Sequence, residues 1–209
     1  IYPGGFKHYE QSLRVVDVLE RDGRGLNLCY ETRMGILNHT VGAPDDTLEA
    51  TTVRLCDRIA YVNHDLDDSI RAGILTEEDV PALERENCGD KNSRRINAFI
   101  SDLIANSGGG KLKMSDEMQE TFNIFHAFMF SDVYTNPVAK SEENKVKGIL
   151  GGLYTYYTSH PDALPDDFRG VIEHDGIERA ACDYISGMTD GYAMEKYGEI
   201  FIPFAWTVK

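Results

Sequence analysis

The chain has 209 residues, 42% of them hydrophobic, and a formal net charge of −14 at pH 7. This length suits one large domain, or a domain with an appendage, and the composition supplies enough apolar residues to build a core. The acidic charge argues against non-specific nucleic-acid binding through a broad basic face, and no apolar run reaches the roughly 18 residues that predict a membrane span.

Glycine and proline breakers divide the first part of the chain into predicted helices. The expected helical ranges are residues 11–20, 28–39 and 48–72, with a short helix starting at residues 76–79. The longest of these helices is capped by Asp46 or Thr47 at its start, and Gly73 follows its end. Its apolar side chains recur at steps of three and four residues, which predicts one buried face.

The second part of the chain continues the same pattern. The expected helical ranges there are residues 93–106, 115–134, 141–160 and 177–201. Strand-like alternation of apolar and polar residues is almost absent. We therefore predict an all-α protein whose interior is built by packing helix on helix.

The four cysteines are Cys29, Cys56, Cys88 and Cys182, and none of them forms a CxxC pair. Such wide separation favours free thiols over a zinc site or a disulfide framework. We therefore expect a cytoplasmic protein with reduced cysteines.

A polar stripe follows the predicted long helix. It comprises Asp57, Tyr61, His64, Asp65 and Asp68, which three- and four-residue steps bring to one face. Asp57 can ligate a metal ion, and Tyr61 can donate a hydrogen bond one turn further on. The alternative for Asp57 is a surface carboxylate with a helical neighbour, and we interpret His64 and Asp68 as part of a solvated polar face.

Several longer motifs occur in a fixed order along nearly the whole chain. They lie at residues 4–16, 25–28, 32–37, 48–50, 56–61, 63–68, 71–73, 182–190 and 192–193. In this order they closely resemble the bacterial deoxyguanosinetriphosphate triphosphohydrolase-like proteins of the HD-domain superfamily. The resemblance implies a multi-helix, HD-domain-like bundle and a cytoplasmic hydrolase.

The resemblance also implies a metal site. Enzymes of this family cleave a dNTP into a deoxynucleoside and inorganic triphosphate, and we expect magnesium or manganese as the divalent ion. Their metal ligands are an upstream His, a His-Asp dyad and a later Asp, and the resemblance implies that Asp57 is the later Asp. His64 and Asp65 stand at the wrong place in the motif order to be the dyad. The other ligands would precede Gly4, so we expect a C-terminal portion of the enzyme that lacks the N-terminal helices of the bundle.

Five further residues receive roles from the resemblance. Arg58 would bind the triphosphate, and Tyr61 would bind a phosphate or the sugar. Asp65 would accept a hydrogen bond from the sugar 3′-hydroxyl. In the first motif, His8 is a candidate catalytic residue and Gln11 a candidate substrate-binding residue. The alternative for His8 is that it has no catalytic role and is a loop residue that precedes a helix.

The expected organisation follows from these assignments. Residues 1–75 would form the C-terminal part of the HD-type catalytic core, and residues 76–209 a helical region packed on it. The expected partners are a deoxynucleoside triphosphate, the missing N-terminal segment and further copies of the chain in a homo-oligomer. Two other functions stay open: a non-catalytic helical scaffold or oligomerisation module, and an HD-type phosphodiesterase that acts on another phosphoester.

Overall fold

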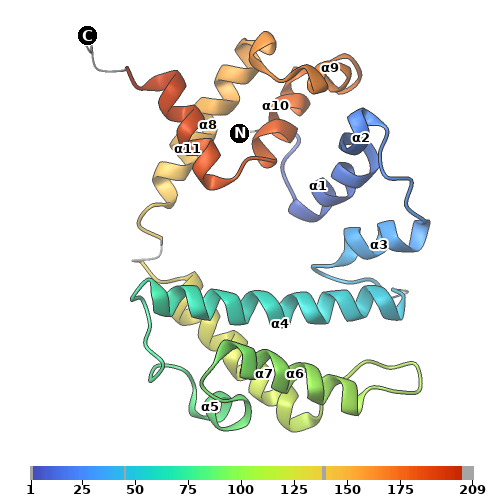
Figure 1. Ribbon diagram of the computed structural model, residues 1–209, viewed down its shortest axis with the longest axis vertical. Coiled ribbons are helices and arrows are strands. Elements are labelled where there is room, and N and C mark those ends of the chain that lie inside the picture. The colour runs from blue at the N-terminus through green and yellow to red at the C-terminus, as the bar shows by residue number, and fades with distance from the viewer. Residues whose placement is uncertain (1, 45, 138–139, 204–209) are drawn as a thin grey trace. The chain divides into compact units, whose positions relative to one another are not determined.

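A computed structural model describes residues 2–44, 46–137 and 140–203 (Figure 1). Within these ranges the regular structure is helical, apart from an isolated bridge between Gly108 and Lys111, which confirms the predicted all-α class. The chain divides into two compact units, a first unit of residues 1–28 and 142–209 and a second unit of residues 29–141. Compactness alone does not test the functional division at residue 75, which stays a prediction.

The first unit is built around the packing of α10 on α8 and α9, and α11 also packs on α8 (Figure 1). Its helical segments are α1 (His8–Arg14), η1 (Val15–Leu19), α2 (Glu20–Gly23), α8 (Glu143–Ser159), η3 (Pro161–Ala163), η4 (Asp166–Phe168), α9 (Arg169–Asp175), α10 (Ile177–Ser186) and α11 (Asp190–Phe201). Leu153 and Ala180 are fully buried at the centre of its core, and Tyr157 is 3% exposed. The buried residues of α10 include Ala180 and Ala181, whose small side chains suit close packing between helices.

The prediction of one continuous helix over residues 177–201 was wrong. The chain breaks after α10, which ends at Ser186, and α11 begins at Asp190. Thr189 has an extended backbone, and its side chain accepts a hydrogen bond from the amide of Tyr192. This contact is an N-cap, which satisfies an amide that the first turn of a helix leaves without a backbone partner.

The second unit packs α3, α6 and α7 against the long helix α4 (Figure 1). Its helical segments are α3 (Tyr30–Asn38), α4 (Leu48–Arg71), α5 (Ala82–Cys88), α6 (Asn92–Asn106), α7 (Asp116–Met129) and η2 (Phe130–Tyr134). The core places Phe99 of α6 edge-on to Phe122 of α7, with ring centroids 5.3 Å apart. Such an aromatic pair contributes about 0.5–1.5 kcal/mol beyond the area that it buries.

The helix α4 agrees closely with the sequence prediction. The Thr47 side chain accepts a hydrogen bond of 3.1 Å from the Ala50 amide, so Thr47, and not Asp46, is the cap. The helix ends before Gly73, whose φ of 70° lies in the left-handed region that glycine adopts at low cost. Its buried stripe includes Val62 and Leu66, both 0% exposed, and burying each contributes about 1.5–3 kcal/mol.

The predicted helix start at residues 76–79 was wrong, and α5 begins later, at Ala82. The Asp79 carboxylate accepts hydrogen bonds of 2.8 Å from the amide and from the hydroxyl of Thr76. These bonds close a local turn that competes with the helix. Pro81 then disfavours the helical conformation of the residue before it and is itself the N-cap of α5.

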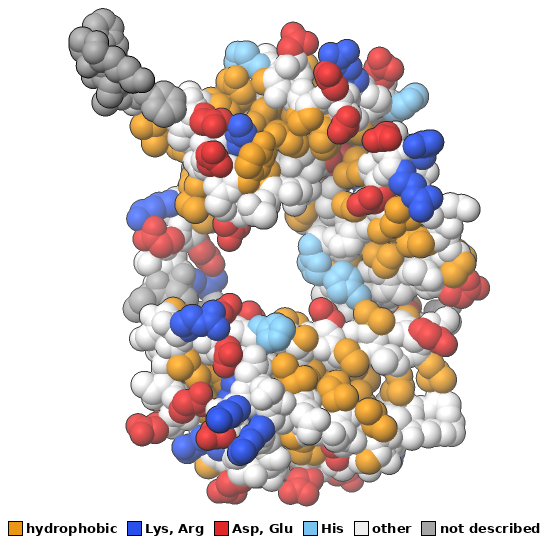
Figure 2. Space-filling view, in the orientation of Figure 1, with side chains coloured by type: hydrophobic (Ala, Val, Ile, Leu, Met, Phe, Trp, Pro, Cys, Tyr) orange, Lys and Arg blue, Asp and Glu red, His pale blue; other side chains and the backbone are white. Residues whose placement is uncertain are grey.

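Three further observations bear on the expectations from composition. No helix within the described ranges combines the length and the apolar character that crossing a membrane requires. On the side that Figure 2 shows, Lys and Arg side chains lie among Asp and Glu side chains and do not form a continuous basic face over either unit. Cys29, Cys56, Cys88 and Cys182 are all free thiols, as expected.

Candidate functional site

Four of the predicted site residues lie on α4 in the second unit. They are Asp57, Arg58, Tyr61 and Asp65. Asp57 is exposed, and its side chain makes no hydrogen bond or ion pair to another residue of the described ranges. Asp57, Tyr61 and Asp65 are each four residues apart, so they follow one another along one face of the helix.

Tyr61 and Arg58 are held by side chains of α7. The Tyr61 hydroxyl lies 3.2 Å from Nε2 of His126, and the Arg58 guanidinium lies 5.4 Å from the centre of the Phe122 ring. Burial lowers the pKa of His126, and the positive charge of Arg58 lowers it further. Both effects favour the neutral imidazole, whose Nε2 can accept a hydrogen bond from the Tyr61 hydroxyl or donate one to it, depending on the tautomer.

Asp65 is fixed by Tyr134, the last residue of the π-helical segment η2. The Tyr134 hydroxyl donates a hydrogen bond of 2.6 Å to Oδ2 of Asp65. Burial and this bond to the carboxylate both raise the pKa of Tyr134, so its hydroxyl stays protonated and keeps donating. A π-helical turn is uncommon and is often found at functional sites.

The rest of the polar stripe behaves as a solvated face. His64 is exposed, and Asp68 forms an exposed ion pair of 2.9 Å with Arg71 on the same helix. Within the described ranges, no three His, Cys, Asp or Glu side chains come close enough to hold a metal ion. Asp57 fits a divalent ion only as a single ligand, which does not make a metal site by itself.

The remaining two predicted residues, His8 and Gln11, lie on α1 in the first unit. His8 is exposed at the first position of the helix, and its carbonyl accepts a hydrogen bond of 2.9 Å from the Ser12 hydroxyl. His8 also lines a cavity of about 500 Å³ whose walls include Phe168 and Tyr184. The catalytic role of His8 stays a prediction.

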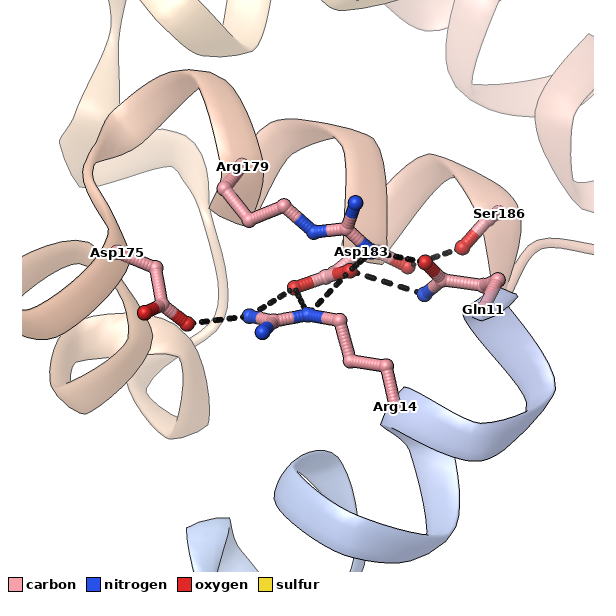
Figure 3. A network of polar contacts seen from close by, with 6 residues as sticks. All are labelled: Gln11, Arg14, Asp175, Arg179, Asp183 and Ser186. Atoms are coloured by element: carbon pink, nitrogen blue, oxygen red, sulfur yellow. Dashed lines mark hydrogen bonds and ion pairs between the residues drawn. The ribbon is translucent and has the colours of Figure 1, made fainter. Parts of the chain in front are cut away.

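Gln11 takes part in a buried polar network between α1 and α10, shown in Figure 3. Its amide donates a hydrogen bond of 2.9 Å to Oδ1 of Asp183, and its carbonyl oxygen accepts one from Arg179. Arg14 donates two bonds to the same carboxylate, of 2.8 and 3.1 Å. These contacts occupy both ends of the Gln11 amide, and its role in binding substrate stays a prediction.

Asp183 is the centre of this network. Its side chain is completely buried and meets Arg14 and Arg179, each at 2.8 Å. Arg14 also forms an ion pair of 2.5 Å with Asp175 (Figure 3). Burial opposes the charge on Arg14, but the bonds to Asp183 and Asp175 raise its pKa on balance. The network therefore joins α1 to α10 through charge-assisted hydrogen bonds.

Sequence reasoning did not identify His126, Tyr134 or Asp183. The Tyr61–His126 contact spans 65 positions and the Asp65–Tyr134 contact spans 69, so no local pattern reports either pair. Asp183 lies inside one of the motifs that carried the family resemblance, and that motif is the one signal that pointed to it.

Comparison with known proteins identifies the relatives of this chain. Residues 112–199 match the phosphohydrolase-associated domain. The chain is thus an all-α protein that carries a phosphohydrolase-associated domain.

Curated relatives make the identification more specific. A deoxyguanosinetriphosphate triphosphohydrolase-like protein of Caldanaerobacter subterraneus is 47% identical, with 97% of this chain and 60% of that protein covered. Proteins of the same description are 41% identical in Clostridium perfringens strain SM101, with 96% and 62% covered, and 31% identical in Nitrosomonas europaea, with 95% and 67% covered. The chain belongs to the family of deoxyguanosinetriphosphate triphosphohydrolase-like proteins. It spans about 60% of the length of the first of these relatives.

Proposed function

We propose that this chain is part of a dNTP triphosphohydrolase of the dGTPase type, which hydrolyses a deoxynucleoside triphosphate to a deoxynucleoside and triphosphate. The observation that carries the proposal is the row formed by Asp57, Tyr61 and Asp65 on α4, with Tyr61 and Asp65 each held by a partner from outside the helix. The relatives' description as deoxyguanosinetriphosphate triphosphohydrolase-like proteins supports the same substrate class.

In this proposal Asp57 supplies one ligand of a divalent metal ion, with magnesium or manganese expected. Carboxylate oxygen suits both of these hard cations. The other ligands would come from residues that the curated relatives have outside the matched part. Such an ion, when bound, polarises a phosphoryl oxygen and lowers the pKa of a bound water.

The other side chains on α4 would bind and orient the substrate. The Arg58 guanidinium can bind two phosphate oxygens at once, and its positive charge would stabilise the negative charge that develops on the triphosphate. Tyr61 would bind a phosphate or the sugar, with its hydroxyl positioned by His126. Asp65 would accept a hydrogen bond from the sugar 3′-hydroxyl through Oδ1, while Tyr134 holds Oδ2.

The direct test is product analysis of the complete protein with dGTP and the other dNTPs, in the presence of magnesium or manganese. We expect triphosphate and deoxynucleoside in equal amounts. Release of pyrophosphate or orthophosphate, or turnover of another phosphoester only, would support the phosphodiesterase alternative. No turnover of any phosphoester would support the scaffold alternative, and cross-linking or light scattering would test the predicted homo-oligomer.

Replacing Tyr134 with phenylalanine is expected to reduce kcat/KM for dGTP by about 10- to 100-fold. The variant removes a hydrogen bond to a charged group, which contributes about 1.5–3 kcal/mol, and leaves Asp65 less well oriented. The measurement compares dGTP with its 2′,3′-dideoxy analogue, which lacks the 3′-hydroxyl. Tyr134→Phe should lose most of the preference for dGTP, whereas Tyr30→Phe, at a tyrosine of the same unit that is 66% exposed, should keep it. An unchanged preference in Tyr134→Phe would count against this role of Asp65.

A further inference from the structure

A second group of charged side chains lies buried in the second unit, where α5 and α6 meet α4. Glu84 of α5 and Arg95 of α6 are both 0% exposed. Arg95 Nε donates a hydrogen bond of 3.2 Å to the side-chain oxygen of Asn63, a buried residue of α4. The distance from the same Nε to the nearer Glu84 oxygen is 3.7 Å, which is too long for a hydrogen bond.

Arg95 is shared among three carboxylates. Besides Glu84, its guanidinium faces Asp67 of α4 at 3.3 Å and Glu77 of the loop before α5 at 3.7 Å. The side chains of Asp67 and Glu77 are 38% and 47% exposed, so water stabilises their charges. Glu84 has no exposed surface, and one guanidinium cannot neutralise all three negative charges. Among the three carboxyl groups, Glu84 is therefore the one whose ionisation costs the most free energy.

The hydrogen bonds of Glu84 lead to the same conclusion. Within the described ranges, neither of its carboxylate oxygens has a hydrogen-bond partner, and Arg95 Nη1 also lacks one. A buried carboxylate without hydrogen-bond donors has nothing to offset its desolvation free energy. A protonated carboxyl group is neutral and can itself donate a hydrogen bond. Burial raises the pKa of Glu84 to about 7, with Arg95 opposing the shift and Glu77 adding to it.

The other groups near Glu84 do not compensate its charge. Arg85 follows it on α5 and is exposed, so water screens its attraction to Glu84. Cys88, one turn further along α5, has its pKa raised to about 12 by burial and by Glu84, so its thiol is neutral. Across the cluster, the positive charge that faces Glu84 is that of Arg95, which also faces the carboxylates of Asp67 and Glu77.

We propose that Glu84 is a proton-binding site at the junction of α4, α5 and α6, and that the second unit takes up a proton there when it folds at neutral pH. A group that binds its proton more tightly in the folded state stabilises that state most at low pH. The contribution is complete below the ordinary glutamate pKa of 4.5 and is lost as pH rises through about 7. Between pH 5 and pH 8 it changes the folding equilibrium constant by roughly 70-fold.

A carbon-13 titration of the glutamate carboxyl groups tests this site directly, with the Glu84 signal assigned as the one that Glu84→Gln removes. We expect a midpoint near pH 7 for Glu84, well above the ordinary glutamate value of 4.5. A Glu84 midpoint near 4.5 would overturn the proposal. The titration follows the unmodified side chain, so it is independent of the proposed enzymatic function.

Chemical denaturation at pH 5, 6, 7 and 8 gives a second test. Glu84→Gln should lose the roughly 70-fold excess stability at pH 5 relative to pH 8, whereas Glu86→Gln should retain it. If Glu84→Gln retains the full pH dependence, Glu84 is not its source. Should Glu84→Gln fail to fold, Glu84→Asp serves to assign the signal, and the titration midpoint of the unmodified protein decides.

Discussion

Replacing Asp57 with alanine is expected to reduce dNTP turnover by the complete protein at least about 100- to 1,000-fold. This range is typical when one group that stabilises a transition state electrostatically is removed. In the proposed site, Asp57 binds the divalent ion, and no other His, Cys, Asp or Glu cluster of the described ranges could replace it. The measurement is triphosphate release from dGTP over a range of magnesium and manganese concentrations.

The natural control is Asp68→Ala, because Asp68 is also exposed on α4 and forms only an exposed ion pair with Arg71. Such pairs contribute about 0–1 kcal/mol, so this variant should turn over dGTP at nearly the normal rate. The Asp57 side chain is exposed and makes no hydrogen bond or ion pair within the described ranges, so circular dichroism should show the same helical content in both variants. Equal activity of the two variants would rule out Asp57 as a metal ligand in this mechanism.

The structure agrees best with the sequence prediction where the determining signals are local. The bounds of α4 depend on an apolar stripe, on Thr47 at one end and on Gly73 at the other, all of which are visible within a single segment. Local signals also misled where two of them compete. The capping-box pattern at residues 76–79 forms its hydrogen bonds, but they close a turn, and Pro81 delays the helix.

The candidate site divides in the same way. The helical period alone brings Asp57, Tyr61 and Asp65 to one face, so their alignment could be predicted. The partners His126 and Tyr134 could not, because folding brings them to α4 from more than 60 positions away. Glu84 shows the limit most clearly, since its sequence context is that of an ordinary helical glutamate, and its burial depends on the packing of α5 against α6 and α7.

The Asp183 network lets the stability of the first unit be tested separately from any enzymatic activity. Asp183→Ala is expected to lower the free energy of unfolding by about 3–5 kcal/mol, because removing one partner of a buried ion pair leaves the other charge uncompensated. Here the guanidinium groups of Arg14 and Arg179, whose side chains are only 18% and 19% exposed, lose the carboxylate that they share, and Arg14 keeps only its ion pair with Asp175. Hydrogen exchange of α1 and α10 peptides, measured beside urea denaturation, assigns the loss to this unit.

A matched control and a shape-conserving variant sharpen this prediction. Asp162→Ala removes an exposed carboxylate of the same unit and should change stability by no more than about 0.5 kcal/mol. Asp183→Asn keeps the shape of the side chain but presents an amide nitrogen to the guanidinium groups, so it should also destabilise the unit. If Asp183→Ala costs less than about 1 kcal/mol, the network does not hold α1 to α10.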